Sequence, residues 1–343
     1  MWNELALKTM TKVLEITPES RVYMGDATAL LGELLPSKRV VVISDTNIDR
    51  THKGLIAPFD HILIGQGEQA KSLATLDEVY RRLIDMGADR TTFILGVGGG
   101  LVTDVAGFVA STYMRGVEFG FLTTTLLGAV DASIGGKNGV NIGGFKNMVG
   151  TFSQPRFVIC DVSLFESLPE REFRAGIAEV IKSAIIADKG LFELLETTTL
   201  ENLRKDRDML EEVVLRAMRV KADIVSQDER EGGIRRVLNL GHTIAHAIEK
   251  SSRKMNHGEA VAVGLYRMVR SAEAQSLLSA DDAERIVALL ERYEFNLVSP
   301  VADKVLLDAM RGDKKRNGDS IHAIYPTAIG SVVDRVVSLD TLP

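Results

Sequence analysis

The rhythm of the hydrophobic pattern changes once along this chain, and that change constrains the fold more than any other feature. In the first half, short apolar and β-branched runs alternate with stretches of three-to-four-residue apolar spacing, which is typical of a parallel sheet wrapped by helices. The predicted buried strands are residues 39–45, 61–65, 91–99, 119–125 and 156–161. The clearest helices between them are residues 73–87 and 101–116.

After Pro169 the strand-like runs give way to long helical patterns. These segments are residues 170–188, 201–225 and 281–295. We therefore predict two domains, an α/β domain with a parallel sheet over residues 1–168 and an all-α domain over residues 169–343. A chain of 343 residues is long enough for each domain to bury its own core.

The charge balance excludes some classes of partner. A net charge of −6 argues against a nucleic-acid partner, which would need a basic face. Any anionic ligand must therefore be bound by a local cluster of Lys and Arg. No apolar run is long enough for a membrane span, and the N-terminus does not resemble a signal peptide. The single cysteine, Cys160, fits a reducing compartment, so we expect a cytoplasmic protein.

A histidine-rich segment, residues 239–261, holds three of the six histidines and two glutamates. If residues 243–250 are helical, His242 and His246 stand one turn apart on one face and can reach one centre. His257 follows a polar break, and Gly258 after it permits close backbone approach. Two imidazoles and a carboxylate would suit a catalytic zinc with an open fourth position. The alternatives are a proton relay, or an HxxxH pair that only caps or lines a helix.

Four glycines within residues 96–100 end one predicted strand and lead directly into a helix. Such glycines let the backbone approach a pyrophosphate, while the helix N-terminus supplies N–H groups. The spacing does not match G-x-G-x-x-G, so a plain tight turn remains an alternative. Asp45 at a strand end, with Glu68 and Lys71 after another strand, favours a dinucleotide, because acidic side chains suit a ribose diol.

Basic and polar side chains gather in glycine-rich frames, which suggests a phosphate site. In the first half they are Arg115, Asp131, Lys137, Asn141, Lys146 and Asn147. In the second half, Glu179 and Lys182 share one helix face, and Lys221, Arg235, Asn239 and residues 313–315 add polar and positive groups. Most surface lysines are merely solvated, and that alternative stays open for Lys221 and Lys315.

Several motifs, taken together and in this order, closely resemble the 3-dehydroquinate synthases. They are GGGLVTDVAGFVASTYMRG, TTTLLGAVDASIGGKNGVN, KNMVGTFSQP, GIAEVIK, RRVLNLGHTIAHAIE, HGEAVAVG and DKK. The resemblance runs from about Asp45 to Lys315, which is most of the chain. It implies an NAD-binding α/β domain, a helical C-terminal domain, a cleft between them for NAD⁺ and Zn²⁺, with Co²⁺ as a possible substitute, and a homodimer.

The resemblance also implies a reaction. A phosphorylated sugar acid, 3-deoxy-D-arabino-heptulosonate 7-phosphate, becomes 3-dehydroquinate and phosphate in the shikimate pathway. NAD⁺ oxidises the C5 alcohol, phosphate leaves by β-elimination, the hydride returns, and an aldol step closes the carbocycle. No net redox change results.

The resemblance assigns roles residue by residue. The implied zinc ligands are Glu179, His242 and His257, and His246 becomes a hydrogen-bonding or proton-relay group. The implied substrate contacts are Asp131, Lys137, Asn147, Lys182, Lys221, Arg235, Asn239 and one lysine of the DKK run, Lys314 or Lys315, with Arg115 reaching the phosphate of the neighbouring subunit. The implied NAD contacts are Asp45, Glu68, Lys71, Gly99, Gly100, Asp104, Thr124, Thr125, Lys137 and Lys146.

Three other functions compete with this interpretation. A polyol dehydrogenase of the glycerol or iron-containing type has a similar glycine turn and a metal, but an uncharged polyol would not explain Lys137, Lys182 and Arg235. The ligand pair of the iron type also fails, because Ser183 stands four residues after Glu179. A catalytically silent binding protein would not need an intact set of ligands and bases. A sister cyclase would act on sedoheptulose 7-phosphate, which has no carboxylate for a guanidinium to hold.

Overall fold

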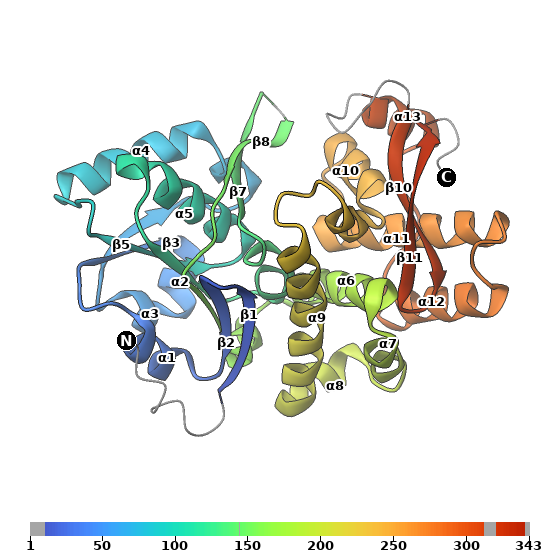
Figure 1. Cartoon of the computed structure of the whole chain (residues 1–343), viewed down its shortest axis with the longest axis horizontal. Helices are drawn as coiled ribbons and strands as arrows, with labels where there is room; N and C mark the ends of the chain where they lie inside the picture. The colour runs from blue at the N-terminus through green and yellow to red at the C-terminus, as the bar shows by residue number, and fades with distance from the viewer. Residues whose placement is uncertain (1–10, 144, 312–319, 340–343) are drawn as a thin grey trace. The chain divides into compact units, whose positions relative to one another are not determined.

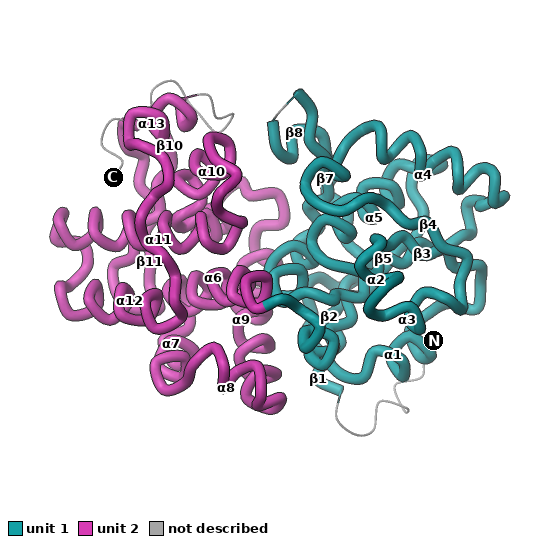
Figure 2. Tube along the Cα trace, turned by 180° about the vertical axis from the view of Figure 1, so that it is seen from behind, with its two compact units in different colours: residues 1–169 teal, residues 170–343 magenta. Residues whose placement is uncertain are grey.

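The structure is a computed structural model that describes residues 11–143, 145–311 and 320–339. It divides into two compact units, residues 1–169 and residues 170–343 (Figure 2). The boundary predicted from the sequence lies one residue earlier. An α/β first part and a helical second part agree with the predicted fold class.

Unit 1 is built on a seven-stranded sheet in the order β1-β2-β9-β6-β5-β3-β4, of which β1, β2, β3 and β5 are labelled in Figure 1. The strands are β1 (Lys12–Thr17), β2 (Ser20–Met24), β3 (Val40–Asp45), β4 (Asp60–Ile64), β5 (Phe93–Gly98), β6 (Phe119–Thr123) and β9 (Phe157–Cys160). All five predicted strands are present, and all pair in parallel. The antiparallel edge pair β1–β2 was not predicted, because half of the residues of β1 are exposed and it lacks a continuous apolar run.

Helices cover both faces of this sheet. They are α1 (Ala27–Leu34), α2 (Thr46–Thr51), α3 (Lys53–Ile56), α4 (Leu73–Asp85) and α5 (Gly100–Thr112), with short turns η1 (Glu68–Ala70), η2 (Tyr113–Arg115), η3 (Gly128–Ala132) and η4 (Val162–Ser167). Apolar residues of α1, α2 and α3 pack on one face with Val42, Leu95 and Leu122. On the other face, Ala106 of α5 contacts β5 at Gly96. A separate hairpin, β7 (Lys137–Ile142) with β8 (Phe145–Phe152), contacts α5 and was not predicted.

The order of the strands reverses between β3 and β5. From β3 the chain continues outward to β4, whereas from β5 it continues through β6 to β9 on the other side. Ser44 pairs with Val97, and Gly98 pairs with Thr123, so the carboxyl ends of three neighbouring strands meet at one edge. Open parallel sheets bind nucleotides outside such a switch point.

Unit 2 is mainly helical. Its helices are α6 (Glu170–Ala187), α7 (Lys189–Glu196), α8 (Leu200–Lys205), α9 (Arg207–Gln227), α10 (His242–Ser251), α11 (His257–Ala274), α12 (Ala280–Arg292) and α13 (Asp303–Arg311), with the 3₁₀ turn η5 (Ile234–Asn239). The predicted helix 201–225 is interrupted at Asp206, whose carboxylate caps α9 by accepting from the Met209 amide at 3.0 Å. None of the helices in the described part of the chain is long and apolar enough to cross a membrane.

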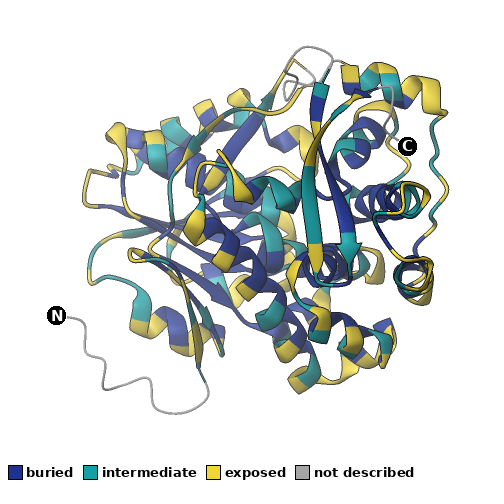
Figure 3. Cartoon of the chain, turned by 45° about the vertical axis from the view of Figure 1, so that its right-hand side comes forward, coloured by how far each residue is buried: buried dark blue, intermediate teal, exposed yellow. Residues whose placement is uncertain are grey.

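A two-stranded hairpin, β10 (Ser320–Ala328) with β11 (Ser331–Ser338), completes unit 2, so this unit is not purely α-helical. Pro326 lies within β10, and a proline inside a strand pattern argues against a strand, which explains why the hairpin was not identified. Strand β10 contacts α11, and the Gly330 amide donates to the Ile185 carbonyl at 3.0 Å. Most residues of α6 and of α11 are buried, and Figure 3 colours the chain by how far each residue is buried.

Candidate functional site

Three helices of unit 2 each contribute one side chain to a compact group of metal-binding type. Glu179 is buried within α6, whereas His242 and His257 are the first residues of α10 and α11. One ligand atom from each lies within 4.8 Å of the others. The Nε2 atoms of His242 and His257 are 3.5 Å and 3.2 Å from Oε1 of Glu179.

Glycines allow the three helices to approach closely enough. A Cβ atom on Gly258 would lie 2.3 Å from the carbonyl oxygen of Ala175, so only glycine fits there. Ala175 is one helical turn before Glu179, and this contact brings the first turn of α11 to the carboxylate. Similarly, a Cβ atom on Gly264 would lie 2.1 Å from the oxygen of Gly241, which seats the start of α10 against α11.

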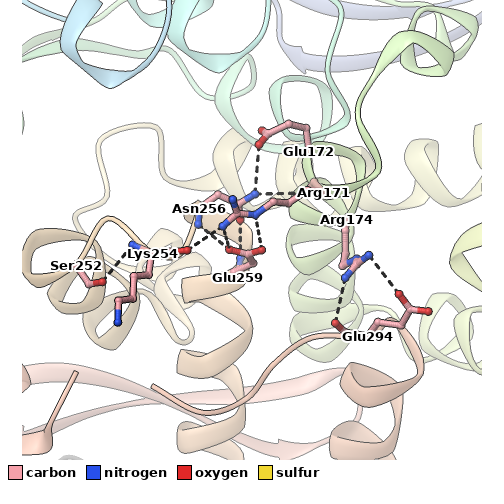
Figure 4. Close-up of polar contacts among 8 residues, drawn as sticks. All are labelled: Arg171, Glu172, Arg174, Ser252, Lys254, Asn256, Glu259 and Glu294. Carbon is pink, nitrogen blue, oxygen red and sulfur yellow. Dashed lines mark hydrogen bonds and ion pairs between the residues drawn. The ribbon is translucent and has the colours of Figure 1, made fainter. Parts of the chain in front are cut away.

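A polar network holds the start of α11 in place (Figure 4). Asn256 and Glu259 form a capping box, in which each side chain accepts from the other's backbone N–H at 3.0 and 2.9 Å. Arg171 of α6 donates to both carboxylate oxygens of Glu259 at 2.7 Å and to the Lys254 carbonyl at 2.9 Å. Glu259 is therefore a capping residue, although it belongs to the histidine-rich segment.

The two histidines of the metal group differ in their protonation. Nδ1 of His242 donates to the Leu240 carbonyl at 3.1 Å. Burial, reinforced by the positive charge of Lys182, lowers the pKa of His242 well below its usual range, so its imidazole is neutral, as a metal ligand must be. Burial also opposes charge on His257, but hydrogen bonds to Glu179 and Glu249 outweigh it and raise the pKa of His257 to about 10.

The residues fit a divalent metal. One carboxylate and two imidazoles form the donor set of catalytic zinc sites, which keep a fourth position open. Lys182 forms an ion pair with Glu179 and adds a positive group beside the ligands. His246 is not a member of the group of three, although its ring stands edge-on to that of His242 with 5.6 Å between centroids.

Metal binding near pH 7 should release about one proton per ion, because His257 must lose its proton to coordinate while His242 is already neutral. Affinity should rise about tenfold per pH unit up to the pKa of His257. Conversely, the raised pKa stabilises the metal-free fold below about pH 6.5, and this stability is lost as the pH rises towards 10. Calorimetric titrations in buffers of different ionisation enthalpy count the protons. A pH-independent affinity would contradict this assignment.

Arg235 is fixed in a closed loop at the start of η5. The carboxylate of Asp228 accepts from the N–H groups of Gly232, Gly233 and Arg235 at 2.9, 2.7 and 3.1 Å. The guanidinium of Arg235 is buried, with the residue 2% exposed, and donates to the Glu229 carbonyl. This loop therefore presents a desolvated cation with a fixed geometry, and sequence analysis did not identify Asp228 as its anchor.

Asn239, at the end of the same 3₁₀ turn, donates to the carboxylate of Glu231. Glu231 has a φ of 60°, an unfavourable backbone conformation for such a residue. Lys221 is buried on α9, so it is not a solvated surface lysine. Lys314 and Lys315 lie outside the described residues.

In unit 1, predicted nucleotide contacts meet at the carboxyl edge of the sheet. Gly99 and Gly100 form the start of α5 after β5, so the predicted strand-to-helix turn is present. Asp45 at the end of β3 caps α2, because its carboxylate accepts from the amides of Asn47 and Ile48 at 2.8 and 3.1 Å. Thr124 and Thr125 follow β6 along the same edge, where the Thr124 amide donates to the carbonyl of Gly98 at 3.0 Å.

A second cluster of unit 1 surrounds a buried ion pair. Lys71 pairs with Asp104, not with Glu68, and burial raises the pKa of Asp104 although the charge of Lys71 opposes this. Glu68 accepts from the Asn141 side chain at 2.7 Å and lies 3.9 Å from Nζ of Lys146. The remaining predicted contacts of this unit are Asp131 in η3, Lys137 at the start of β7, and Asn147 in β8, whose amide donates to the Asn141 side chain.

Arg115 lies in an unusual turn. Met114, Arg115 and Gly116 have φ values of 49°, 72° and 114°, so two non-glycine residues in succession adopt the left-handed conformation. Such strain often marks a functional segment. Arg115 itself is exposed.

Two family models match the chain. The model described as 3-dehydroquinate synthase N-terminal matches residues 61–175, and the one described as 3-dehydroquinate synthase C-terminal matches residues 176–316. A 3-dehydroquinate synthase of Pelobacter propionicus is 45% identical over 275 residues, covering 79% of this chain and 77% of the relative. One of Saccharolobus solfataricus is 40% identical over 345 residues, covering 97% of each chain.

Solved structures have the same fold. A 2-deoxy-scyllo-inosose synthase with carbaglucose-6-phosphate, NAD⁺ and Co²⁺ has a TM-score of 0.87 at 25% identity, covering 97% of this chain and 98% of that one. A 2-epi-5-epi-valiolone synthase from Streptomyces hygroscopicus subsp. jinggangensis 5008, with NAD⁺ and Zn²⁺, has a TM-score of 0.85 at 25% identity, covering 97% of each chain. A probable glycerol dehydrogenase from Sinorhizobium meliloti shares the fold alone, with a TM-score of 0.62 at 16% identity, covering 95% and 94%.

Proposed function

The chain belongs to the 3-dehydroquinate synthase family, and we propose that it converts 3-deoxy-D-arabino-heptulosonate 7-phosphate into 3-dehydroquinate and phosphate. The observation that carries this proposal is the three-ligand group of Glu179, His242 and His257 in a unit that also buries Lys182 and Arg235. Ligands for a Lewis acid and desolvated cations for an anionic substrate then occur in one helical unit.

Glu179, His242 and His257 would hold a divalent metal, zinc or cobalt, which when bound is a Lewis acid that favours an alkoxide on the substrate. Lys182, paired with Glu179, would place an ammonium group beside the substrate hydroxyls. His246, one turn along α10 from His242, is positioned to accept and return a proton. These roles divide the site into ligands that bind the metal and neighbours that move protons.

The carboxyl edge of unit 1 would bind NAD, which accepts a hydride from the substrate and returns it, so that no net oxidation occurs. Gly99 and Gly100 at the start of α5 offer backbone N–H groups to the pyrophosphate. Asp45 stands at the switch point, where a carboxylate suits a ribose. The further proposed NAD contacts are Glu68, Lys71, Asp104, Thr124, Thr125, Lys137 and Lys146.

The buried guanidinium of Arg235 favours the carboxylated substrate over that of the sister cyclases. A guanidinium can bind a carboxylate through two parallel hydrogen bonds, and Asn239 follows one turn later on η5. The other proposed substrate contacts are Asp131, Lys137, Asn147, Lys221 and Lys314. The curated synthases reach 45% identity to this chain, and the two solved cyclases 25%, which supports the same choice.

We further propose a cytoplasmic homodimer. Two observations support a dimer in which Arg115 reaches the substrate phosphate of the neighbouring subunit. The chain belongs to this family, and Arg115 is exposed in a strained turn. The single buried cysteine, Cys160, suits a reducing compartment. Light scattering should then give twice the 37.5 kDa of one chain.

Phosphate should be released continuously from the heptulosonate phosphate with only catalytic amounts of NAD⁺, because each hydride is returned to the same bound substrate. Absorbance at ~340 nm should therefore stay flat. A metal-dependent polyol dehydrogenase would instead form NADH in proportion to product, and a silent binding protein would release no phosphate. Parallel measurement of phosphate and NADH separates the three. Stoichiometric NADH formation would overturn the proposed function.

A further inference from the structure

A second carboxylate lies beside His257, next to the ring nitrogen that does not face Glu179. Glu249 lies on α10, and its side chain is only 8% exposed. Its Oε1 atom is 3.4 Å from Nδ1 of His257. Because Glu249 follows His242 by seven residues, both occupy the same face of one helix.

The two nitrogens of the His257 ring therefore face two different carboxylates. Nε2 is 3.2 Å from Glu179, a proposed ligand, and Nδ1 is 3.4 Å from Glu249. When Nε2 coordinates a metal, the ring proton must lie on Nδ1, where an acceptor stabilises it and fixes the ring.

We propose that Glu249 is a positioning residue that holds the His257 imidazole with Nδ1 protonated and Nε2 directed at the metal. This inference rests on the proposed metal site. His242 receives the corresponding support from the Leu240 carbonyl, which accepts from its Nδ1 at 3.1 Å. The two histidine ligands are thus oriented by acceptors of different charge. The carboxylate strengthens its ligand more than the carbonyl does, because a negative charge raises the basicity of the imidazole.

The test compares the metal affinity of Glu249→Gln and Glu249→Met with that of the intact full-length protein. Zn²⁺ affinity is measured without substrate or NAD, by competition with a chromophoric chelator. Glu249→Met removes the acceptor and should weaken Zn²⁺ binding about 10- to 100-fold. Glu249→Gln keeps an oxygen acceptor but loses the charge. Its Zn²⁺ affinity should therefore lie between those of the wild-type protein and Glu249→Met.

A control separates this role from a change in net charge. Glu273 lies near the end of α11, away from the ligands, and pairs with Arg270. Glu273→Gln removes the same charge from unit 2 and should leave the Zn²⁺ affinity unchanged. The visible spectrum of the Co²⁺-loaded protein should shift in Glu249→Met, because the ring of one ligand is no longer fixed, and should not shift in Glu273→Gln.

The outcomes distinguish failure of this inference from failure of the proposed site. If the wild-type protein does not bind Zn²⁺ stoichiometrically, the proposed metal site itself is wrong. Wild-type binding, with both Glu249 variants within twofold of it, would overturn only the positioning role. A Glu249→Met variant that lowers the Tm of the metal-free protein but keeps its Zn²⁺ affinity and Co²⁺ spectrum would show that Glu249 acts in packing alone.

Discussion

Replacing His257 with alanine is expected to remove both the bound metal and turnover, whereas replacing His246 with alanine should remove turnover and leave the metal in place. His257 supplies one of three ligand atoms that lie within 4.8 Å of one another. Loss of a residue that only supports a ligand typically weakens metal binding about 10- to 100-fold. Loss of a ligand itself should weaken metal binding further. His246 stands beside the group, and loss of a general acid–base typically costs about 10²–10⁴ in rate.

Elemental analysis of both purified variants measures the metal, and phosphate release measures turnover. Circular dichroism checks that each variant retains its helices, because His257 begins α11. A His257→Ala variant that retains one zinc per chain would remove His257 from the ligand set. A His246→Ala variant without metal would show that His246 is itself a ligand.

The second large effect is expected at Arg235. If its guanidinium pairs with the substrate carboxylate, Arg235→Leu leaves that carboxylate desolvated without its partner. Such a loss typically costs about 2–5 kcal/mol, which is about one and a half to three and a half decades in kcat/KM. Steady-state phosphate release with the heptulosonate phosphate measures it.

Arg236 provides a matched control in the same turn. Its side chain is partly exposed, donates to the Gly232 carbonyl at 2.5 Å and lies 3.8 Å from Asp334, and surface contacts of this kind contribute only about 1 kcal/mol each. Arg236→Leu should therefore change kcat/KM by less than about tenfold. Equal losses in both variants would mean that the turn η5 is perturbed as a whole, and an unchanged Arg235→Leu variant would remove the carboxylate contact.

The sequence predicted the central strands of the sheet well because β3, β5, β6 and β9 are buried along most of their length. β3, β5 and β9 are almost uninterrupted apolar runs between turn residues, and such runs are characteristic of parallel strands. The two hairpins were not predicted because their strands have weaker apolar patterns. β7 and β8 contain glycine and polar residues, and Pro326 interrupts the pattern of β10.

The candidate site depends on contacts that no local pattern contains. Helical spacing groups His242 with His246, but the structure brings His242 to His257, because Gly241 and Gly264 let two helix backbones meet. The resemblance to a known family, not the spacing, singled out that pair. Glu249 was within reach of sequence analysis, since it repeats the helical period from His242. Asp228 was not, because a loop closed on a carboxylate has no periodic signal.

The most direct test of the proposed function is a comparison of two substrates on the purified wild-type protein. Initial rates of phosphate release are measured with 3-deoxy-D-arabino-heptulosonate 7-phosphate and with sedoheptulose 7-phosphate, at catalytic NAD⁺ and saturating zinc. A buried guanidinium left without its carboxylate should lower kcat/KM for the second substrate by about one and a half to three and a half decades. Equal or faster turnover of sedoheptulose 7-phosphate would contradict the proposed function.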